Sequence, residues 1–457
     1  MKLFTLAEEK KRIDNVTYVN EHIKKCAKRV RIRDYLPGQV TYNLGPYPAK
    51  FSIEPTEYDY NLIKSFAEKG VGLIQVHEEW NDHIRLYGAD KYSSHDREGM
   101  KNFIKLCHSF GIKVLPYLSS FYFDRRDPDF RRDFMRYESY LISVHFEYAN
   151  CSARSETWAT YFFDKMKRVF DEYEFDGIYN DTGCEEFAKR HAEVRAQGRK
   201  TCVQSDIHYD PYEEDFYARM YSFVKESNGI MKMHYSNVCR PASDEKLYDY
   251  LWVGEGMSDL DSLLGTVEFD PYLIPCPDLR WTSEEAVKRM FAQTIPFLQF
   301  PLRPDGRPYQ AEKIISVPGV KYLKSGMYDT YLEMAEYDRQ HPNGPYSYSD
   351  WSGIPDNEEY RAKWFNYLAL YKPMVEENSV CYMNVTESTL TRGALPEKVY
   401  MSVFMGNEVY LCLSNLSDAV QTVELQEAWV NRETNARQSR FEIPTGGLVF
   451  LIKPESK

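Results

Sequence analysis

Short apolar runs of strand length alternate with longer segments of helical periodicity from about residue 40 to residue 376. In the clearest example, the apolar run 71–76 is followed by a segment whose apolar residues recur at helical spacing between Met100 and Phe110. Gly111 then provides a natural helix end, and the next apolar run starts at once. This alternation predicts a series of parallel β/α units.

The same pattern predicts eight strands with helices between them. The strands are expected at residues 40–44, 71–76, 112–118, 175–181, 229–235, 250–255, 295–299 and, for the eighth, near 346–351. The helices include segments at 185–195, 213–227, 282–293 and 357–371. Eight such units predict a (β/α)8 TIM-like barrel with enlarged loops. A doubly wound open sheet would instead carry a glycine-rich phosphate-binding turn after an early strand, and the sequence has none there.

The periodicity changes after about residue 378, where apolar residues alternate with others in the manner of half-buried strands. Gly406 and Asn407 separate two such runs and predict a hairpin turn. We therefore expect two domains, a barrel at 1–376 and a C-terminal antiparallel β-sandwich at 377–457. The first 35 residues look helical and charged, and we assign them to the barrel as an N-terminal extension.

Charge, hydropathy and cysteine content bear on the partners and the cellular location of the protein. The net charge is −12 with no long basic run, which argues against nucleic acid and against an anionic membrane surface as partners. The N-terminus becomes charged before an apolar signal core could form, and no segment is apolar enough to span a bilayer. The nine cysteines are scattered and include no Cys-x-x-Cys pair. We expect a cytoplasmic protein with reduced thiols, no cofactor and no metal; a homo-oligomer stays open.

Two carboxylates follow predicted strands and are the candidates for chemistry. Asp181 ends the fourth strand, and Glu255 ends the sixth between two glycines. Residues at the carboxyl ends of barrel strands face the reaction chamber, and a pair of acids is what glycoside hydrolysis uses. The alternative, purely structural roles are a helix cap for Asp181 and a salt bridge in a loop for Glu255. Asp176 lies at the opposite end of the fourth strand, where we expect a structural role.

Further candidates could bind a sugar substrate. Aromatic residues make up 15% of the chain, and Tyr and Trp suit a ligand with both apolar and polar surface, although a large aromatic core explains them equally well. Trp80 stands among carboxylates and predicts a sugar-stacking platform. The substrate-binding candidates at or after strand ends are His77, Glu79, Trp80, Asp82, Tyr117, Asn180, His234, Arg240 and Arg303.

The fourth strand reads Asp-Gly-x-Tyr-x-Asp and ends at Asp181. Together with an acid on the sixth strand and a C-terminal antiparallel domain, this resembles the retaining α-glycosidase superfamily of barrel glycoside hydrolases, which includes α-galactosidase-like, α-glucosidase-like and endo-α-N-acetylgalactosaminidase-like enzymes. The resemblance implies that Asp181 is the nucleophile and Glu255 the general acid/base. It implies cleavage of an α-linked bond in an oligosaccharide or glycoside with retention of configuration.

Two positions depart from the patterns of this superfamily. The α-galactosidases and α-glucosidases usually carry Asp as the acid/base, where this chain has Glu255. The α-amylase pattern has an arginine two residues before the nucleophile, where this chain has Tyr179. We therefore expect a bacterial branch without a close match to a named family.

Two other functions remain open on the sequence. A metal-dependent barrel hydrolase could use His77, His234 and Asp181, although the paired-histidine spacing of such sites is missing. A non-catalytic carbohydrate-binding barrel could keep the pocket without the chemistry, although both acids are present.

Overall fold

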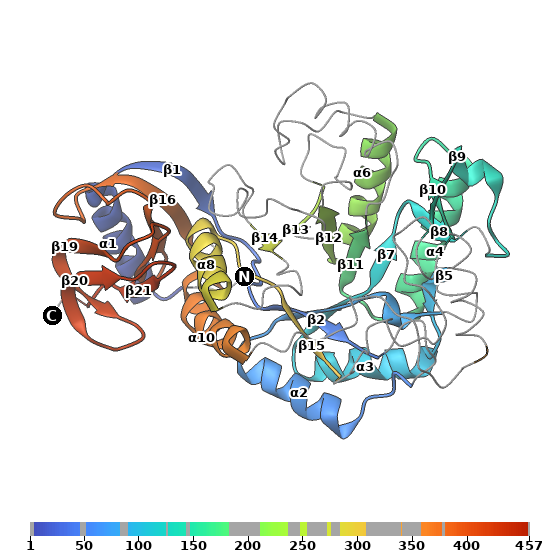
Figure 1. Ribbon diagram of the computed structural model, residues 1–457, viewed down its shortest axis with the longest axis horizontal. Helices are drawn as coiled ribbons and strands as arrows, with labels where there is room; N and C mark the ends of the chain where they lie inside the picture. The colour runs from blue at the N-terminus through green and yellow to red at the C-terminus, as the bar shows by residue number, and fades with distance from the viewer. Residues whose placement is uncertain are drawn as a thin grey trace. The chain divides into compact units, whose positions relative to one another are not determined.

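The computed structural model describes residues 4–45, 52–82, 90–124, 127–142, 147–181, 211–235, 247–253, 272–275, 284–307, 340, 358–376 and 380–455. The chain forms two compact units, each assembled from separate segments (Figure 1). The barrel unit comprises Gln39–Met257 and Arg303–Asp356. The sandwich unit comprises Met1–Gly38, Ser258–Leu302 and Asn357–Lys457.

The barrel unit is built on parallel strands. They are β2 (Gln39–Asn43), β3 (Leu73–Val76), β6 (Lys113–Leu115), β7 (Tyr117–Ser119), β11 (Gly177–Asp181), β12 (Ile230–Tyr235), β13 (Tyr250–Val253) and β15 (Arg303–Gly306). Neighbours follow the order β15-β2-β3-β6 in one group and β7-β11-β12-β13 in the other. Parallel pairing of consecutive strands confirms the predicted β/α units.

Pro116 divides the strand that the sequence predicts at 112–118 into β6 and β7. Proline has no N–H to donate to a ladder, so the strand is interrupted there. The residues before Pro116 pair with β3, and those after it pair with β11. The break therefore transfers the chain from one parallel neighbour to the next.

Four helices of the barrel unit are amphipathic: α2 (Glu57–Glu68), α3 (Arg97–Ser109), α4 (Glu156–Glu172) and α6 (Pro211–Glu226). The predicted apolar face of α3 is buried at Met100, Phe103, Ile104 and Cys107. Helix α3 lies against β6 and α6 against β12 (Figure 1). The remaining short elements of the unit are η1 (Glu78–Trp80), β4 (Asn81–Asp82), β5 (Asp90–Ser94), β8 (Tyr122–Asp124), η3 (Arg132–Phe134), β9 (Met135–Ile142) and β10 (Glu147–Cys151).

The start of β11 explains the Asp-Gly pair in the fourth-strand sequence. Gly177 has φ 142°, and a Cβ there would lie 2.0 Å from the carbonyl oxygen of Ile230. Only glycine tolerates both the conformation and the close approach of β12. Asp176 accepts hydrogen bonds from the Val114 N–H and from His108, each at 2.8 Å, which agrees with the structural role expected for it.

The sandwich unit contains a seven-stranded antiparallel sheet in the order β1-β16-β17-β18-β21-β19-β20. Its strands are β1 (Ile23–Arg31), β16 (Cys381–Ser388), β17 (Val399–Met405), β18 (Val409–Asn415), β19 (Gln421–Asn431), β20 (Arg437–Ile443) and β21 (Leu448–Ile452). The predicted hairpin around Gly406 and Asn407 is confirmed as the β17–β18 pair. The unit also includes α1 (Leu6–His22), β14 (Leu273–Pro275), α8 (Glu284–Thr294), η4 (Ile295–Phe297) and α10 (Glu358–Val375).

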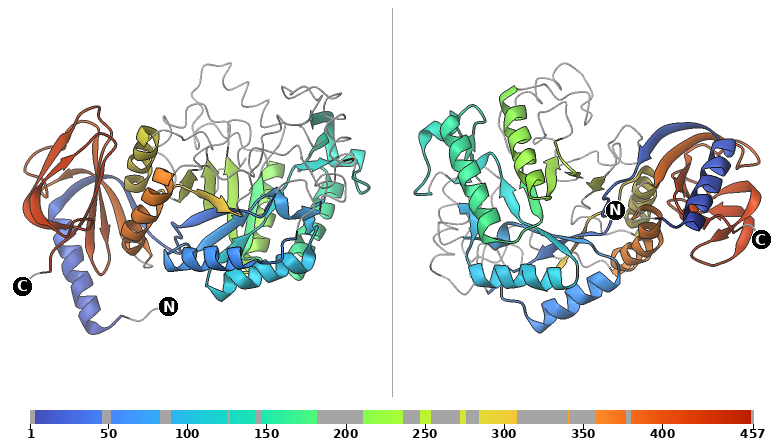
Figure 2. Two further views of the ribbon diagram at one scale, coloured as in Figure 1. Left: turned by 60° about the horizontal axis from the view of Figure 1, so that its bottom comes forward. Right: turned by 180° about the vertical axis from the view of Figure 1, so that it is seen from behind.

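The N-terminal segment belongs to this sheet, whereas the sequence assigned it to the barrel. The predicted helix is confirmed as α1, but the chain then continues as β1, which pairs with β16. Figure 2 shows α1 against the same sheet. Val19 and Ile23 enter the apolar core of the sheet, and Asn15 Nδ2 donates to the carbonyl oxygens of Gly406 and Asn407 at 3.1 and 2.9 Å. The expected domain boundary at 376/377 stays a prediction.

The strand predicted at 295–299 is wrong. Ile295–Phe297 forms the 3-10 helix η4 directly after α8, and Leu298 adopts a left-handed conformation that ends it. The strands in this part of the chain are β14 and β15 instead. The helix predicted at 185–195 and the eighth strand predicted near 346–351 lie outside the described residues.

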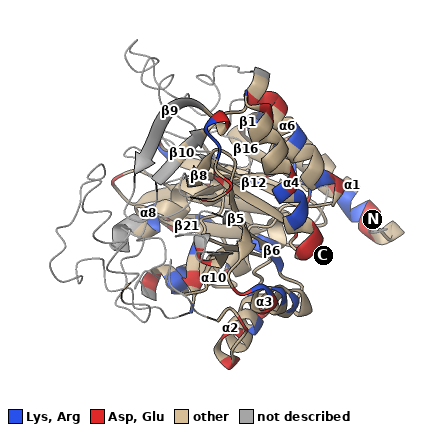
Figure 3. Ribbon diagram, turned by 90° about the vertical axis from the view of Figure 1, so that its right-hand side faces the viewer, with Lys and Arg blue, Asp and Glu red and all other residues tan. Residues whose placement is uncertain are grey.

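The described residues allow three expectations from the sequence to be examined: the distribution of charge, the absence of a membrane-spanning segment and the state of the cysteines. Acidic and basic residues are interspersed along α1, α2, α3 and α4 (Figure 3). None of the described helices combines the length and apolar character required to cross a bilayer. The described cysteines carry free thiols, and Cys107, Cys151 and Cys412 are buried.

Candidate active site

Asp181 is the last residue of β11, at the carboxyl edge of the parallel sheet, and it is partly exposed. The Tyr117 hydroxyl donates to Asp181 Oδ2 at 2.6 Å. Tyr117 comes from the neighbouring strand β7, where it is the register partner of Tyr179 and therefore lies two positions before the partner of Asp181. The Asp181 backbone carbonyl accepts a bond from the Ser120 N–H at 3.2 Å. The side chain of this acid is therefore held from β7, and its main chain is held by the residue that follows β7.

A second pair of polar groups lies beside this acid. Tyr179 Oη and His234 Nδ1 share a buried hydrogen bond of 2.7 Å. Residues two apart on a strand point to the same face, so Tyr179 and Asp181 face the same side of β11. Burial lowers the pKa of His234, and the Asp181 carboxylate opposes this by raising it. His234 is therefore neutral at pH 7 and binds Tyr179 as a neutral imidazole.

Aromatic rings surround the two pairs. The ring centroid of His77 lies 5.9 Å from that of Tyr179 and 6.4 Å from that of Tyr117. Trp252 on β13 packs on His234 with a centroid separation of 4.7 Å. Burial, followed by the charge of Lys232, lowers the pKa of His77 to about 3. Both predicted histidines are therefore neutral rings at pH 7.

Lys232 is a residue that the candidates from the sequence missed. It is fully buried on β12, two positions before His234, and its Nζ donates to Gln39 Oε1 at 3.1 Å. Tyr179 is its register partner on β11. The alternation of Lys232 and His234 with apolar residues along β12 was the signal that placed both side chains on one face. A buried cation therefore lies deeper on the face that carries the site.

Trp80 does not serve as a sugar platform in this structure. Its side chain is fully buried and packs edge-on against Tyr173 and Phe175, with centroid separations of 5.6 and 5.3 Å. The indole N–H donates to the backbone carbonyl of Tyr117 at 3.0 Å. Glu79, its neighbour in η1, is buried as well. Neither ring face of Trp80 is offered to a ligand, because the packing of η1 turns the side chain into the core.

Asn180 and Arg303 also differ from their expected roles. Asn180 alternates with Asp181 along β11, so it faces the other side of the strand, where its Nδ2 donates to Ser120 Oγ at 3.0 Å. Arg303 is the first residue of β15 rather than a residue beyond a strand end, and its Nε donates to Asp305 Oδ2 at 2.8 Å. The error in the strand at 295–299 placed Arg303 at the wrong edge.

Three predicted site residues remain: Asp82, Glu255 and Arg240. Asp82 lies in β4, paired with β5. Glu255 and Arg240 lie outside the described residues. Glu255 follows the last residue of β13, Val253, by two positions, and Val253 is the register partner of Tyr235 at the end of β12.

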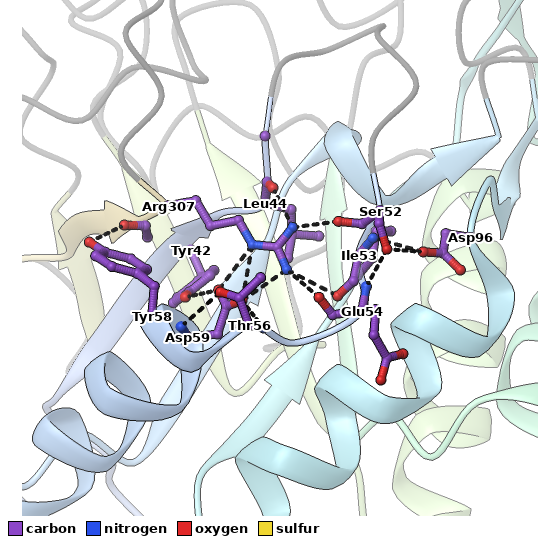
Figure 4. Close-up of polar contacts among 12 residues, drawn as sticks. Tyr42, Leu44, Ser52, Ile53, Glu54, Thr56, Tyr58, Asp59, Asp96 and Arg307 are labelled. Carbon is purple, nitrogen blue, oxygen red and sulfur yellow. Dashed lines mark hydrogen bonds and ion pairs between the residues drawn. The ribbon is translucent and has the colours of Figure 1, made fainter.

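Arg307, which follows β15, joins the chain after β2 to helix α2 (Figure 4). Its guanidinium donates to Asp59 on α2 at 2.9–3.2 Å and to the carbonyl oxygens of Leu44, Ser52, Ile53 and Glu54 at 2.6–3.2 Å. Tyr42 Oη donates to the same carboxylate at 2.6 Å. The chain leaving β15 therefore fixes the chain leaving β2.

The candidate metal ligands His77, His234 and Asp181 can be compared with the described side chains. Among the residues that the structure describes, no group of three His, Cys, Asp or Glu side chains could hold a metal ion. Two of the three candidate metal ligands are hydrogen-bonded to tyrosine hydroxyls. Asp181 is bonded to Tyr117, and His234 is bonded to Tyr179.

The architecture of the two units defines a known class of fold. The (β/α)8 barrel with an antiparallel β-sandwich is a fold that solved α-amylase structures share. Comparison with protein-family models and with curated proteins gives no match.

Individual solved structures carry this likeness over most of the chain. A maltogenic α-amylase from Thermotoga neapolitana is similar with a TM-score of 0.54 and 12% identity, covering 92% of this chain and 100% of the amylase. An α-amylase from Geobacillus thermoleovorans, solved with acarbose, gives 0.54 and 9%, covering 92% and 99%. The α-glucosyl transfer enzyme XgtA gives 0.53 and 12%, covering 91% and 98%. At these identities the likeness concerns the fold.

Proposed function

We propose that this protein is a glycoside hydrolase that cleaves an α-linked bond in an oligosaccharide, with Asp181 as nucleophile and Glu255 as general acid/base. The observation that carries the proposal is the place of Asp181, at the carboxyl end of a barrel strand and hydrogen-bonded by Tyr117. The α-amylase-type fold supports the same reading.

The proposed reaction uses the carboxyl groups of Asp181 and Glu255 in two steps. In the first step Glu255 protonates the glycosidic oxygen while Asp181 attacks the anomeric carbon, so the glycosidic C–O bond breaks as a glycosyl-enzyme forms. In the second step Glu255 takes a proton from water, the water oxygen attacks the same carbon, and the Asp181 carboxylate leaves. Two displacements give net retention of configuration.

The choice of first substrates follows from the similar structures. One is described as a maltogenic amylase, one was solved with acarbose, and one transfers α-glucosyl groups. We therefore propose short α-glucosides as the first substrates to test. A transfer reaction uses the same glycosyl-enzyme with a sugar hydroxyl in place of water, so products should be searched for both outcomes.

The experiment compares the wild-type protein with Asp181→Asn and Glu255→Gln on aryl α- and β-glycosides and on short α-gluco-oligosaccharides. We expect the wild type to cleave the α-series. Glu255→Gln should lose roughly 10²- to 10⁴-fold in rate, the range for one general acid/base, and Asp181→Asn should lose at least as much. NMR of the first product formed should show the anomer of the substrate, as retention requires.

Asp176→Asn is the matched control, because it changes an acid at the amino end of the same strand. It should lower stability and leave the turnover of folded protein within a few-fold. Equal activity of the wild type, Asp181→Asn and Glu255→Gln would reject the proposed site. Sugar binding without turnover by wild type would favour a non-catalytic carbohydrate-binding protein, and loss of activity with a chelator would favour a metal-dependent hydrolase.

A further inference from the structure

Tyr117 contacts the reacting group of the proposed function rather than the outer surface of a substrate. It is 7% exposed, and its hydroxyl lies 2.6 Å from Asp181 Oδ2. A phenol that donates to a carboxylate forms a charge-assisted hydrogen bond, which is shorter and stronger than a bond between neutral groups. Oδ2 of Asp181 is engaged by this bond, which assigns the attack to Oδ1.

Two neighbouring rings and one backbone hydrogen bond hold Tyr117 in place. Its centroid lies 5.8 Å from that of Tyr179 and 6.4 Å from that of His77. Its own backbone carbonyl accepts the indole N–H of Trp80. Tyr179 is in turn held by His234. Since these neighbours restrict the ring, the hydroxyl reaches Asp181 without first losing conformational freedom.

We propose that Tyr117 is the positioning residue of the nucleophile, and that it assists the second step of the reaction in particular. This rests on the proposed function. While the glycosyl-enzyme exists, Asp181 Oδ1 is bonded to the anomeric carbon and Oδ2 is the carbonyl oxygen of the ester. As water adds to that carbon, the Oδ1–carbon bond breaks and its electron pair returns to the carboxylate. The Tyr117 hydroxyl then stabilises the charge that reappears on Asp181.

The test replaces Tyr117 by Phe, which removes only the hydroxyl. Tyr92→Phe is the matched control, because the Tyr92 hydroxyl donates at 3.3 Å to the backbone carbonyl oxygen of Ser119, on the same strand. With an activated aryl α-glucoside, kcat of Tyr117→Phe should fall by about 10- to 100-fold, the range for a hydrogen bond to a charged group. KM should fall with it, and the covalent glycosyl adduct should accumulate, seen as a burst of aryl alcohol and by intact-protein mass.

A second readout does not depend on turnover. The Tyr117 hydroxyl proton should give a slowly exchanging, downfield ¹H NMR resonance in the wild type. The resonance should be absent in Tyr117→Phe, shifted in Asp181→Asn and retained in Tyr92→Phe. If Tyr117→Phe fails to fold, the shift in Asp181→Asn still tests the contact.

The outcomes separate the two proposals. Turnover of Tyr117→Phe within about two-fold of an active wild type, without adduct, overturns the positioning role, and so do equal losses in Tyr117→Phe and Tyr92→Phe. An inactive wild type whose resonance shifts in Asp181→Asn keeps the contact and rejects the glycosidase function. A wild type with no such resonance, or with one that Asp181→Asn leaves unmoved, rejects the contact itself.

Discussion

At the residue scale, the Tyr117 hydroxyl holds the candidate nucleophile Asp181 by a hydrogen bond. Tyr179 occupies the position where the α-amylase pattern has an arginine, and it bonds to His234 instead. The cation nearby is Lys232, the register partner of Tyr179 on the next strand. Lys232 is fully buried, and its Nζ donates to Gln39 Oε1 at 3.1 Å.

Trp80 provides a prediction at this scale. Trp80→Phe keeps an aromatic ring but removes the indole N–H that binds the Tyr117 carbonyl. We expect the free energy of unfolding to fall by about 1–3 kcal/mol, because a buried carbonyl loses its donor and the smaller ring leaves space. KM for the α-glucoside should stay within about two-fold. Denaturant unfolding and steady-state kinetics measure both, and a large rise in KM at unchanged stability would restore the stacking role.

At the element scale, the ends of β2, β15 and α2 meet at the buried ion pair of Arg307 and Asp59. Burial raises the pKa of Asp59, but the hydrogen bonds from Arg307, Tyr42 and Thr56 outweigh it, and the pKa is lowered overall. A carboxyl group with a lowered pKa stabilises the fold above its unfolded pKa of about 3.9. That stability is lost as the pH falls through the lower, folded pKa.

Asp59→Asn tests this network. At pH 6 the variant should lose about 3–5 kcal/mol of stability, the cost of leaving a buried charge without its partner. Between pH 5 and pH 2 the wild type should lose stability more steeply than the variant. Asp133→Asn is the control, since Asp133 pairs with Arg131 at the exposed surface and its removal should leave stability unchanged. Parallel pH profiles for wild type and Asp59→Asn would contradict the assignment.

At the scale of the whole molecule, each unit is assembled from distant parts of the chain. The sandwich unit draws on the N-terminal segment, a central segment and the C-terminal strands. Strand β1 covers the edge of β16, and α1 contributes Val19 to the shared core. The first residues of the chain therefore complete a sheet whose other strands lie more than 300 residues later.

Deletion of residues 1–31 should destabilise the sandwich unit, because it exposes the edge of β16 and the apolar core beneath α1. Calorimetry should show a lowered unfolding transition, and light scattering should show self-association of the shortened protein. Deletion of residues 1–3 is the control and should change neither. A deletion of 1–31 that unfolds like the wild type and stays dispersed would show that the sheet is complete without β1.

The sequence by itself determined the features that depend on local periodicity. The strand ending at Asp181, the buried face of α3 and the β17–β18 hairpin follow from spacings of two and of three to four residues, which the backbone geometry fixes without reference to distant partners. The same logic located the carboxylate at a strand exit.

Only the tertiary structure decided which groups meet. Whether β1 belongs to the barrel or to the sheet of β16 depends on packing across the length of the chain. Trp80 was a candidate platform by its neighbours in sequence, but the core formed with Tyr173 and Phe175 takes its side chain inward. The bond from Tyr117 to Asp181 joins residues 64 positions apart through the pairing of β7 with β11. Such contacts depend on strand order and register, which periodicity along one segment does not specify.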